Sequence, residues 1–564
     1  MIEVSDIRVP LSRGGSEEAF LREGSRAAQR LLGAAPRDID AVELHRVSVD
    51  ARKKSDVHFT VSVRVRLRTA QDESRALGRI SSRDARRVRA VQEDVPAWPR
   101  PLGKLSASHP RPVVVGAGCA GLFCALALAE AGLEPLLIER GDDAERRTRA
   151  VRTFDDRGEL DPECNIQFGL GGAGTFSDGK LTTGTRNPAH RLILEELVAA
   201  GAPREILWDA KPHVGSDILP AVVTRIVARI RDLGGEVRFR ARLTDIERGP
   251  AGEVRAIRAI RVARAAGVSG QGQSQAATVP EERIACDCLV LACGHSARDV
   301  FELLRDRGIT LARKTFAMGA RIEHLQADVD RAQYGPAAGD PALGAAPYKL
   351  VAHAPNGRSL FTFCMCPGGE VVAAASEPDG VVTNGASLHA RAGNNANAAL
   401  LVNVNPADLP GDDPLAGVEL QRRCERAAFE LGGGAFRAPA QLVGDFLRGE
   451  PSAGAGHVKP TYPRGVAWGD IAPVLPVHIV ETMRLGLPML ARRLRAFEDA
   501  QAVLTAVESR SSSPVTIVRG KDLVAVGAPG LYPCGEGAGY AGGIMSAATD
   551  GIRVANAVIE SIAG

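Results

Sequence analysis

Long apolar runs are missing from this sequence. No stretch approaches the ~20 residues that a membrane-spanning helix requires. The first residues, MIEVSDIRVPL, lack the basic region and the apolar stretch of a secretion signal. Cysteine is scarce as well, because ten cysteines in 564 residues do not make a disulfide framework. We therefore expect no membrane partner and a location in a reducing cytoplasm.

A strong net charge is also absent. The formal charge is +3, which gives no global electrostatic support for nucleic-acid binding. Residues 75–111 do form a basic run, which could bind RNA or an acidic partner. No aromatic stacking platform is interleaved between Arg75 and Arg89. We interpret this run as a solvated helix and linker surface and do not expect nucleic acid as a partner.

The chain is long enough for two to four domains of ~100–200 residues each. Residues 1–104 have the pattern of a small α+β domain followed by a linker. The spacing predicts a module of strands with one or two helices. The strands are expected at Ile2–Val9, Val42–Val49 and His58–Leu67, and a helix at Glu17–Leu32. The five prolines between Val95 and Pro112 mark the linker.

From Arg111 onward the pattern changes to strand, glycine turn, helix and strand. The strand PVVVG precedes an apolar helix from Cys119 to Ala131, and PLLIER is a second strand. This order predicts a parallel βαβ unit. Its turn fits GxGxxG, in which Gly116 allows a tight turn, Gly118 admits a pyrophosphate and Gly121 lets helix and strand pack closely. The helix N-terminus would offer N–H groups to the phosphates.

Glu139 ends the second strand, at the spacing of an acid that binds ribose hydroxyls. A carboxylate there would accept two hydroxyl hydrogen bonds and repel a 2′-phosphate, which favours FAD or NAD over NADP. FAD is favoured over NAD by a second glycine-rich element, Gly535–Gly539 with Gly542-Gly543-Ile544, just before the last helix. A flavin needs such a second clamp, whereas a simple NAD dehydrogenase does not. No His or Cys lies in a flavin-linking context, so we expect noncovalent FAD.

The rest of the chain completes a three-part arrangement. The pattern of Cys288–Gly294 predicts another buried strand, and residues 263–279 are expected to form a polar insertion between strands. The predicted fold class is α/β: a discontinuous Rossmann-like FAD-binding domain, an α+β substrate or cap domain and the small N-terminal α+β domain. The boundaries that we predict are 1–104, 105–296 (FAD, first part), 297–504 (substrate or cap) and 505–564 (FAD, C-terminal part).

Several segments carry a specific resemblance. RPVVVGAGCAGLFCALALAEAGLEPLLIERG and GLYPCGEGAGYAGGIMSAATDGIRVANAV resemble the two ends of the glutathione-reductase-type FAD fold. CNIQFGLGGAGTFSDGKLTTGT, RIEHLQADVDRAQYG, FTFCMCPGGEVVAAASE and ESRSSSPVTIVR are similar to a family of bacterial FAD-dependent dehydrogenases with a small N-terminal domain. The resemblance covers nearly the whole chain.

The resemblance implies that residues 171–175 run along the pyrophosphate and flavin, that the strand around Leu243 passes the adenine, and that the last helix points at the N1–C2=O edge of the flavin. Combined with the motifs, it places these residues at the cofactor: Gly116, Ala117, Gly118, Cys119, Ala120, Gly121, Glu139, Arg140, Gly172, Ala173, Gly174, Thr175, Leu243, Ala292, Cys293, Gly294, Gly535, Glu536, Gly542, Gly543 and Ile544.

Catalytic residues are less well defined by the sequence. The polar candidates near the flavin are Lys180, His295, Cys366, Arg391 and Tyr540, each of which could equally be a surface or packing residue. Arg391 would suit an anionic substrate group, because guanidinium binds carboxylate bidentately. The pair Cys364-Met-Cys366 is tighter than the CxxC of a redox dithiol, which favours structural or pocket-lining thiols. We expect no metal site, because no completing ligand set accompanies the cysteines.

The function predicted from these features is an oxidoreductase. FAD would exchange a hydride with a small-molecule substrate, and an electron donor or acceptor would complete the cycle. One alternative is a flavin monooxygenase, but those proteins usually carry a Gly-Asp element ending in Ala-Ala-His where this chain has GEGAGYAGG. A second alternative is a flavin-bound sensor or RNA-associated protein that acts through the N-terminal domain. No second strand–GxGxxG–helix unit is found, so we expect no dedicated NAD(P)H domain.

Overall fold

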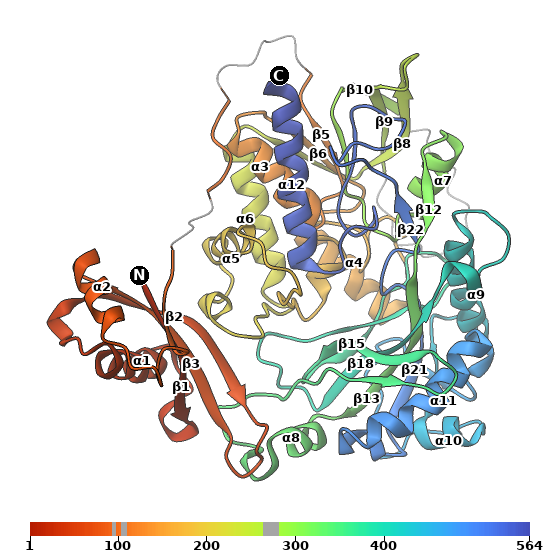
Figure 1. Ribbon diagram of the computed structural model, residues 1–564. Coiled ribbons are helices and arrows are strands. Elements are labelled where there is room, and N and C mark those ends of the chain that lie inside the picture. Colours follow the sequence, from red (N-terminus) through yellow and green to blue (C-terminus); the bar gives the residue numbers. More distant parts are fainter. Residues whose placement is uncertain (93–96, 103–109, 263–280, 564) are drawn as a thin grey trace.

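The computed structural model describes residues 1–92, 97–102, 110–262 and 281–563. The chain forms an N-terminal part, a cofactor part built on a parallel sheet, and a part built on a second, larger sheet (Figure 1). The insertion predicted at 263–279 and much of the proline-rich linker lie outside the described residues.

The N-terminal part is a four-stranded antiparallel sheet with two helices. Its strand order is β2-β3-β1-β4. Valines 61, 63 and 65 of β3 are fully buried, and together with Phe20 of α1 they form a separate hydrophobic core. The predicted helix and strands of this region are confirmed. The elements are β1 Ile2–Pro10, α1 Glu17–Leu32, β2 Ile39–Asp50, β3 His58–Leu67, α2 Ala70–Gly78 and β4 Val88–Ala90.

The cofactor part is built on a five-stranded parallel sheet of order β23-β11-β5-β6-β7. Since β23 comes from the C-terminal region, the end of the chain returns to this sheet, as predicted. The elements are β5 Val113–Val115, α3 Cys119–Glu130, β6 Leu136–Glu139, α4 Ala144–Arg157, α5 Ala189–Ala199, α6 Leu219–Asp232, β7 Glu236–Phe239, β8 Ala241–Arg248, β9 Val254–Arg261, β10 Glu281–Ala285, β11 Leu289–Leu291, α7 Arg298–Asp306, β23 Leu531–Pro533 and α12 Ile544–Ala563.

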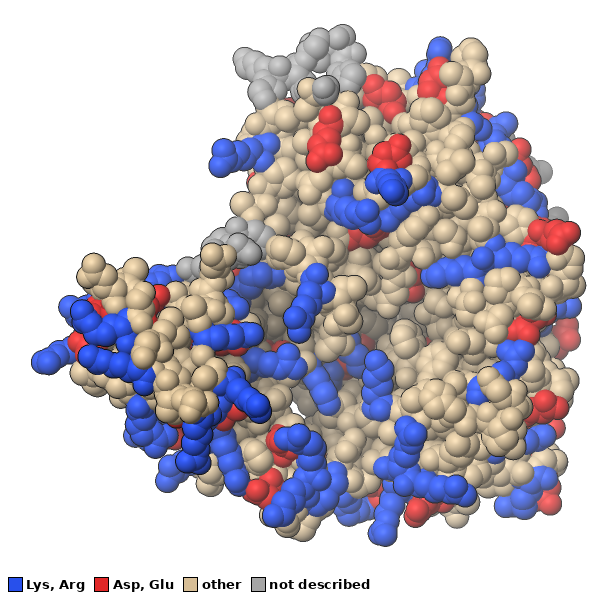
Figure 2. Space-filling model, viewed as in Figure 1, with Lys and Arg blue, Asp and Glu red and all other residues tan. Residues whose placement is uncertain are grey.

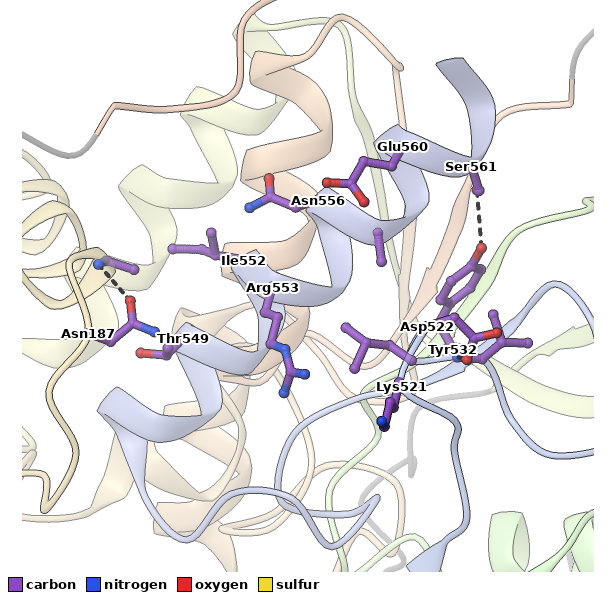
Figure 3. Close-up of a pocket in the computed structure, with 14 residues that line it drawn as sticks. Asn187, Lys521, Asp522, Tyr532, Thr549, Ile552, Arg553, Asn556, Glu560 and Ser561 are labelled. Atoms are coloured by element: carbon purple, nitrogen blue, oxygen red, sulfur yellow. Dashed lines mark hydrogen bonds between the residues drawn. The ribbon is translucent and has the colours of Figure 1, made fainter. Parts of the chain in front are cut away.

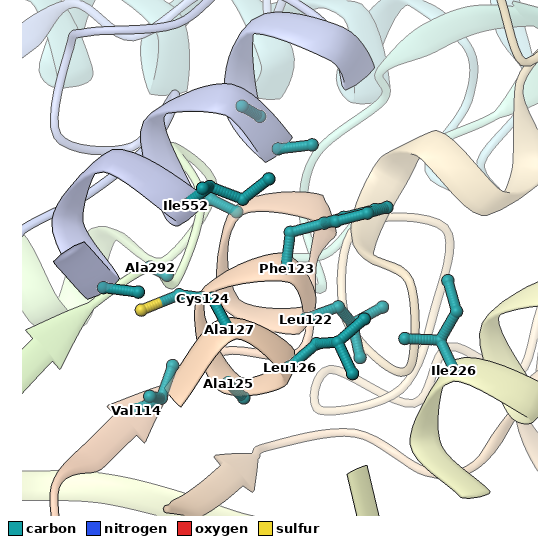
Figure 4. Close-up of a cluster of buried hydrophobic side chains, with 14 of the residues drawn as sticks. Val114, Leu122, Phe123, Cys124, Ala125, Leu126, Ala127, Ile226, Ala292 and Ile552 are labelled. Carbon is teal, nitrogen blue, oxygen red and sulfur yellow. The ribbon is translucent and has the colours of Figure 1, made fainter. Parts of the chain in front are cut away.

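Alternate residues of the parallel strands face two different cores. Val114 faces helices α3, α6 and α12, whereas Val113 and Val115 face α7 and the three-stranded sheet β10-β9-β8. Both faces are covered, which explains why the strands are continuous apolar runs. Figure 4 shows the helical side, including Val114, Leu122, Phe123, Leu126, Ile226 and Ile552.

The third part is a seven-stranded sheet of order β14-β15-β18-β13-β21-β19-β20. Helices α8 and α11 pack on it, and its core also contains residues of α9 and α10. The elements are β13 Phe316–Leu325, α8 Gln326–Tyr334, β14 Val351–His353, β15 Ser359–Cys366, β16 Glu370–Ala373, β17 Thr383–Ala386, β18 Asn395–Val404, α9 Ala416–Leu431, β19 Ala438–Leu442, α10 Val443–Arg448, β20 Val466–Trp468, α11 Val477–Ala491 and β21 Val503–Glu508. Strands β12 Leu311–Arg313 and β22 Val515–Ile517 pair between the two larger parts.

Two predicted domain boundaries need correction. The boundary at 504/505 falls inside β21, which pairs with β13 as far as Glu508 and with β19 as far as Thr505, so this sheet extends beyond it. The boundary at 296/297 assigns α7 to the substrate part, whereas α7 packs in the core of the cofactor part. Short 3-10 turns are Leu11–Arg13, Pro36–Asp38, Gly172–Phe176, Arg204–Leu207, Gly335–Ala337, Pro406–Asp408, Ala472–Val474 and Arg495–Glu498.

The N-terminal part docks on the cofactor part by extending an edge strand. Val47 of β2 donates its N–H to Trp208 O (2.8 Å), and Ala210 donates to Val47 O (2.9 Å). The Trp208 ring also contacts Phe20 of α1 at 5.9 Å between centroids. Many lysine and arginine side chains lie on the visible face of this part, among neutral and a few acidic residues (Figure 2). Arg75, Arg87 and Arg89 of the basic run each lie within salt-bridge distance of an acid. None of the described helices is both long and apolar enough to cross a membrane.

Candidate cofactor and substrate site

The first glycine turn adopts the geometry that its sequence predicts. Gly116 has φ +101°, and a Cβ on it would lie 2.6 Å from Ala292 O. A Cβ on Gly121 would lie 1.8 Å from Gly116 O, so helix α3 could not approach β5 with any side chain there. Both positions therefore require glycine for packing.

Gly118 is different, because it faces open space. A Cβ there would meet only Gly172 Cα, at 3.9 Å. The segment 171–172 runs beside it, held by the hydrogen bond from Gly171 N to Ala117 O (2.8 Å). Helix α3 begins directly after Gly118, at Cys119. The opening therefore combines a bare backbone with the free N–H groups of a helix N-terminus, which suits a phosphate.

Glu139 ties this turn together. Its Oε2 accepts a hydrogen bond from Ala117 N (2.8 Å), and its Oε1 accepts from Gly141 N and Gly169 N (both 2.9 Å). A carboxylate has about four acceptor sites. Three are filled by the backbone, so about one remains for a ribose hydroxyl, rather than the two that the sequence suggested. The Glu139 side chain is only 5% exposed. Together with its three backbone hydrogen bonds, this burial indicates that its main role is to hold three loops in place.

The second glycine element meets the first. A Cβ on Gly535 would lie 2.6 Å from Ala120 Cβ of helix α3, and Gly535 N donates to Asp550 Oδ2 (2.8 Å). Ile544, at the start of α12, lies 3.4 Å from the Cβ position of Gly174. The loops that begin near residues 116, 172 and 535, which are far apart in sequence, therefore converge.

Open glycines mark the space between these loops. Cβ atoms built on Gly294, Gly542 and Gly543 would meet nothing within 4 Å. Together with Gly118 they provide bare backbone on several sides, which is what an extended dinucleotide needs for close approach. The residues present thus fit FAD.

Other expected cofactor residues have side chains committed elsewhere. Arg140 pairs with Glu163 (2.8 Å) and Asp299 (2.9 Å). Thr175 donates to Leu170 O (3.1 Å). The Leu243 side chain is buried in the core beside the parallel sheet. At Thr175 and Leu243, therefore, only backbone atoms remain available for contact with a cofactor. Ala173, Ala292 and Cys293 lie in the loops that surround the opening.

Three of the five catalytic candidates gather at one place. Lys180 Nζ lies 3.9 Å from Cys366 Sγ and 2.8 Å from Asp178 Oδ2. Arg391 Nε donates to Asp178 Oδ1 (2.9 Å), so a buried carboxylate already holds the guanidinium that the sequence suggested for an anionic substrate group. Burial lowers the pKa of Lys180, but Cys366, Cys364 and Asp178 outweigh it and raise this pKa overall.

The other two candidates have different surroundings. His295 Nε2 is hydrogen-bonded to Arg510 O (3.0 Å), and its Nδ1 lies 3.7 Å from Glu536 Oε1. Burial lowers the pKa of His295 to about 4. Burial likewise raises the pKa of Glu536 to about 7, opposed by Lys314 and reinforced by Cys364. Tyr540 is held apart, since its hydroxyl donates to Ile517 O (3.1 Å) and accepts from Arg519 N (3.1 Å).

Several buried charges near the site were missed by sequence reasoning. Arg321 pairs with Glu508 (2.8 Å) and donates to Cys364 O (3.0 Å), and all its partners are remote in sequence. Arg147 is fully buried and donates to five carbonyl oxygens of residues 165–172, which shapes the second cofactor loop. No local sequence pattern identifies Arg321 or Arg147 as a buried charge. Asp550 had a signal, because it is an acid within the apolar helix α12.

A groove of about 710 Å³ lies along α12, away from these loops (Figure 3). Its walls include Asn187, Lys521, Tyr532, Arg553, Asn556 and Glu560. The glycines that surround the cofactor opening do not line it, so it is a separate surface feature.

One group of possible metal ligands exists among the described residues. Asp328, His457 and Asp499 have ligand atoms within 4.8 Å of one another. His457 Nε2 already bonds Asp499 Oδ2 (2.9 Å), and Asp328 pairs with Arg331. Hydrogen bonds and ion pairs thus account for this surface group.

The parallel sheet, the glycine turns and the returning C-terminal strand define a Rossmann-type flavoprotein. Residues 315–511 match the family described as "FAD-dependent protein, C-terminal domain-like", and residues 114–159 match an NAD(P)-binding Rossmann-like domain. Residues 1–66 match a domain of unknown function. An uncharacterized protein of Clostridium beijerinckii is 41% identical over 538 residues, which is 94% of each chain. The chain belongs to this family of FAD-dependent oxidoreductases, and FAD is its cofactor.

Solved structures with a similar course are flavoproteins of several kinds. A flavin-dependent brominase is 14% identical with a TM-score of 0.36, over 81% of this chain and 80% of that one. A glycerol-3-phosphate dehydrogenase of Bacillus halodurans, complexed with FAD, is 10% identical with a TM-score of 0.33, over 81% and 65%. A geranylgeranyl bacteriochlorophyll reductase-like protein of Thermoplasma acidophilum is 11% identical with a TM-score of 0.34, over 80% of each chain. At these values the likenesses carry no argument about the reaction.

Proposed function

We propose that this protein is an FAD-dependent dehydrogenase or reductase that transfers a hydride between the flavin and a small organic molecule. The observation that carries the proposal is the cluster of Lys180, Asp178, Arg391 and Cys366. It joins the segment that follows the second cofactor loop to the end of strand β15, so a polar, partly buried group of side chains lies where the cofactor part meets the larger sheet.

Bound FAD supplies the acceptor or donor of the electron pair. The chain supplies position and charge. The Lys180 ammonium, which Asp178 orients, can donate a hydrogen bond to a carbonyl or carboxylate oxygen of the substrate. Burial would raise the pKa of Asp178, but Lys180 and then Arg391 outweigh it and lower this pKa to about 2, which keeps Asp178 ionised. Arg391 also holds the carboxylate in place. The substrate class that fits best is therefore a small molecule with an oxygen that bears negative charge or partial charge.

The test is anaerobic reduction of the bound flavin by a metabolite library, followed by the loss of flavin absorbance. We expect one class of oxygen-bearing metabolites to reduce it. With that metabolite, Lys180→Met should slow reduction by ~10- to 150-fold, which corresponds to a charge-assisted hydrogen bond of about 1.5–3 kcal/mol. Lys521→Met, in the groove along α12, is the matched control and should leave the rate unchanged.

The alternatives predict different results. A monooxygenase would consume oxygen together with a reduced nicotinamide cofactor and insert oxygen into its substrate. A sensor or RNA-associated flavoprotein would show a salt-sensitive shift with RNA and no turnover. Failure of every metabolite to reduce the flavin, combined with either of these results, would replace the proposal.

A further inference from the structure

Cys364 and Cys366 lie on an irregular part of strand β15. Phe363 pairs with Ala399 of β18, whereas Cys366 pairs with Asn397, so three steps along β15 correspond to two along β18. This is a β-bulge. Cys364 is the bulged residue and has φ +41°, which is uncommon for a side chain other than glycine.

The bulge brings the two thiols together. The Cys366 sulfur lies 3.3 Å from Cys364 O, and the Cys366 side chain is close enough to lower the pKa of the Cys364 thiol. The sequence favoured structural thiols because CxC spacing in a regular strand is tighter than the CxxC of a redox dithiol. The structure removes that objection.

The two cysteines have unequal surroundings. Cys366 is fully buried, whereas Cys364 is partly exposed. The hydrogen bond from Cys366 lowers the pKa of Cys364 well below its usual value. Burial opposes this shift, and the cations Lys180 and Arg321 reinforce it. The same hydrogen bond, together with burial, raises the pKa of Cys366. A partly exposed thiolate beside a buried thiol is the pattern of an attacking cysteine and a resolving cysteine.

The pair also lies near segments that border the cofactor opening. Lys180 reaches Cys366 from the segment that follows residues 172–176, and Cys364 acts electrostatically on Glu536 of the second glycine element. The thiols therefore lie beside the segment that follows the second cofactor loop.

We propose that Cys364 and Cys366 form a redox-active dithiol that exchanges an electron pair with the bound flavin. In the forward direction the Cys364 thiolate and the Cys366 thiol form a disulfide. The Cys366 S–H bond breaks, and the electron pair and its proton pass to oxidised FAD, which becomes the singly protonated reduced anion. Charge and atoms balance, with no other reactant. The external partner would be a small thiol or disulfide, which Cys364 reaches by thiol–disulfide exchange.

This inference depends on FAD binding and not on the proposed hydride substrate. The test is an anaerobic dithionite titration of the oxidised holoprotein. The wild type should take up about four electrons per flavin, two for FAD and two for the disulfide, whereas Cys364→Ser and Cys366→Ser should take up about two. Cys424→Ser, a buried cysteine on α9, is the matched control and should behave as the wild type.

A second measurement uses the wild type alone, in case the variants do not fold. Trypsin releases residues 359–391 as one peptide, in which Cys364 and Cys366 are the only cysteines. After incubation of the holoprotein in glutathione disulfide, this peptide should have lost two hydrogen atoms and should resist alkylation. Reduction of the flavin by dithionite should restore both thiols. Uptake of only about two electrons by the wild type would overturn the proposal. So would a peptide that stays reduced, or a disulfide that the reduced flavin cannot open.

Discussion

Replacing Glu139 tests the loop-fixing role that the structure gives it. Three buried backbone N–H groups, on Ala117, Gly141 and Gly169, depend on this carboxylate. In Glu139→Gln, one oxygen can still accept from Gly141 and Gly169, but the amide NH₂ then faces Ala117 N–H. One donor is left unpaired, which costs about 1–3 kcal/mol. Glu139→Ala leaves all three donors without this acceptor, so its cost should be up to about three times larger.

The assay separates folding from cofactor affinity. Urea denaturation of the apoproteins gives the free energies of unfolding, and titration with FAD gives dissociation constants. We expect both variants to be less stable as apoproteins, in the order wild type, Gln, Ala, and to bind FAD more weakly. If Glu139→Gln were as stable as the wild type in the apo form and lost only FAD affinity, the carboxylate would serve the ribose rather than the loops, and the reasoning would be wrong.

Three further predictions concern other parts of the molecule. Stopped-flow mixing should show poor direct reduction of the flavin by NADH or NADPH, and reduction at catalytic rates would contradict this. A chain that begins near Leu105 should still bind FAD, but thermal denaturation should show reduced stability, because it loses the edge contact of Val47 with Trp208 and Ala210. Burial raises the pKa of Glu536 from 4.5 to about 7, so the folded apoprotein holds this proton more tightly than the unfolded chain. Its stability should therefore fall as pH rises across that window, and Glu536→Gln should remove that part of the pH dependence in urea titrations.

The sequence predicted those features of the structure that depend on local residue patterns. Gly116 and Gly121 occupy positions where a Cβ would collide with backbone, and the period of the apolar residues located β3 and α1 to the residue. Long-range partners are what the sequence could not show. Arg391 looked available for a substrate, but nothing in the sequence shows that Asp178, 213 residues away, binds it.

The bulge at Cys364 illustrates the same limit. CxC spacing alone suggested structural thiols, because it is tighter than CxxC. The effect of the additional residue in β15 depends on its register with β18, which the local sequence does not encode. The sequence likewise assigns most of β21 to the returning C-terminal region. Only its pairing with β13 shows that it belongs to the larger sheet.

Helix α12 offers a last test, which concerns the electronic state of the flavin. Its 20 residues begin at Ile544, next to the open Gly542 and Gly543. Aligned peptide dipoles give such an end about half a positive charge. The resemblance to glutathione-reductase-type proteins implies that this end faces the N1–C2=O edge of the isoalloxazine. Negative charge collects at that edge when the flavin is reduced or when sulfite adds to it, so the helix should favour both.

Ser546 allows this effect to be changed by charge alone. Its hydroxyl accepts from Gly542 N (3.1 Å) and donates to Gly543 O (3.0 Å), within the first turn. Ser546→Asp adds a negative charge there, and Ser546→Asn adds the same shape without it. The Asp variant should bind sulfite about two- to fivefold more weakly than the Asn variant, which corresponds to about 0.3–1 kcal/mol, and should have a lower flavin potential. Asn556→Asp, further along α12, should have little effect, because the interaction fades beyond the first turn. Equal sulfite affinities and potentials in the two Ser546 variants would show that this helix end does not act on the flavin and that its glycines serve only the turn.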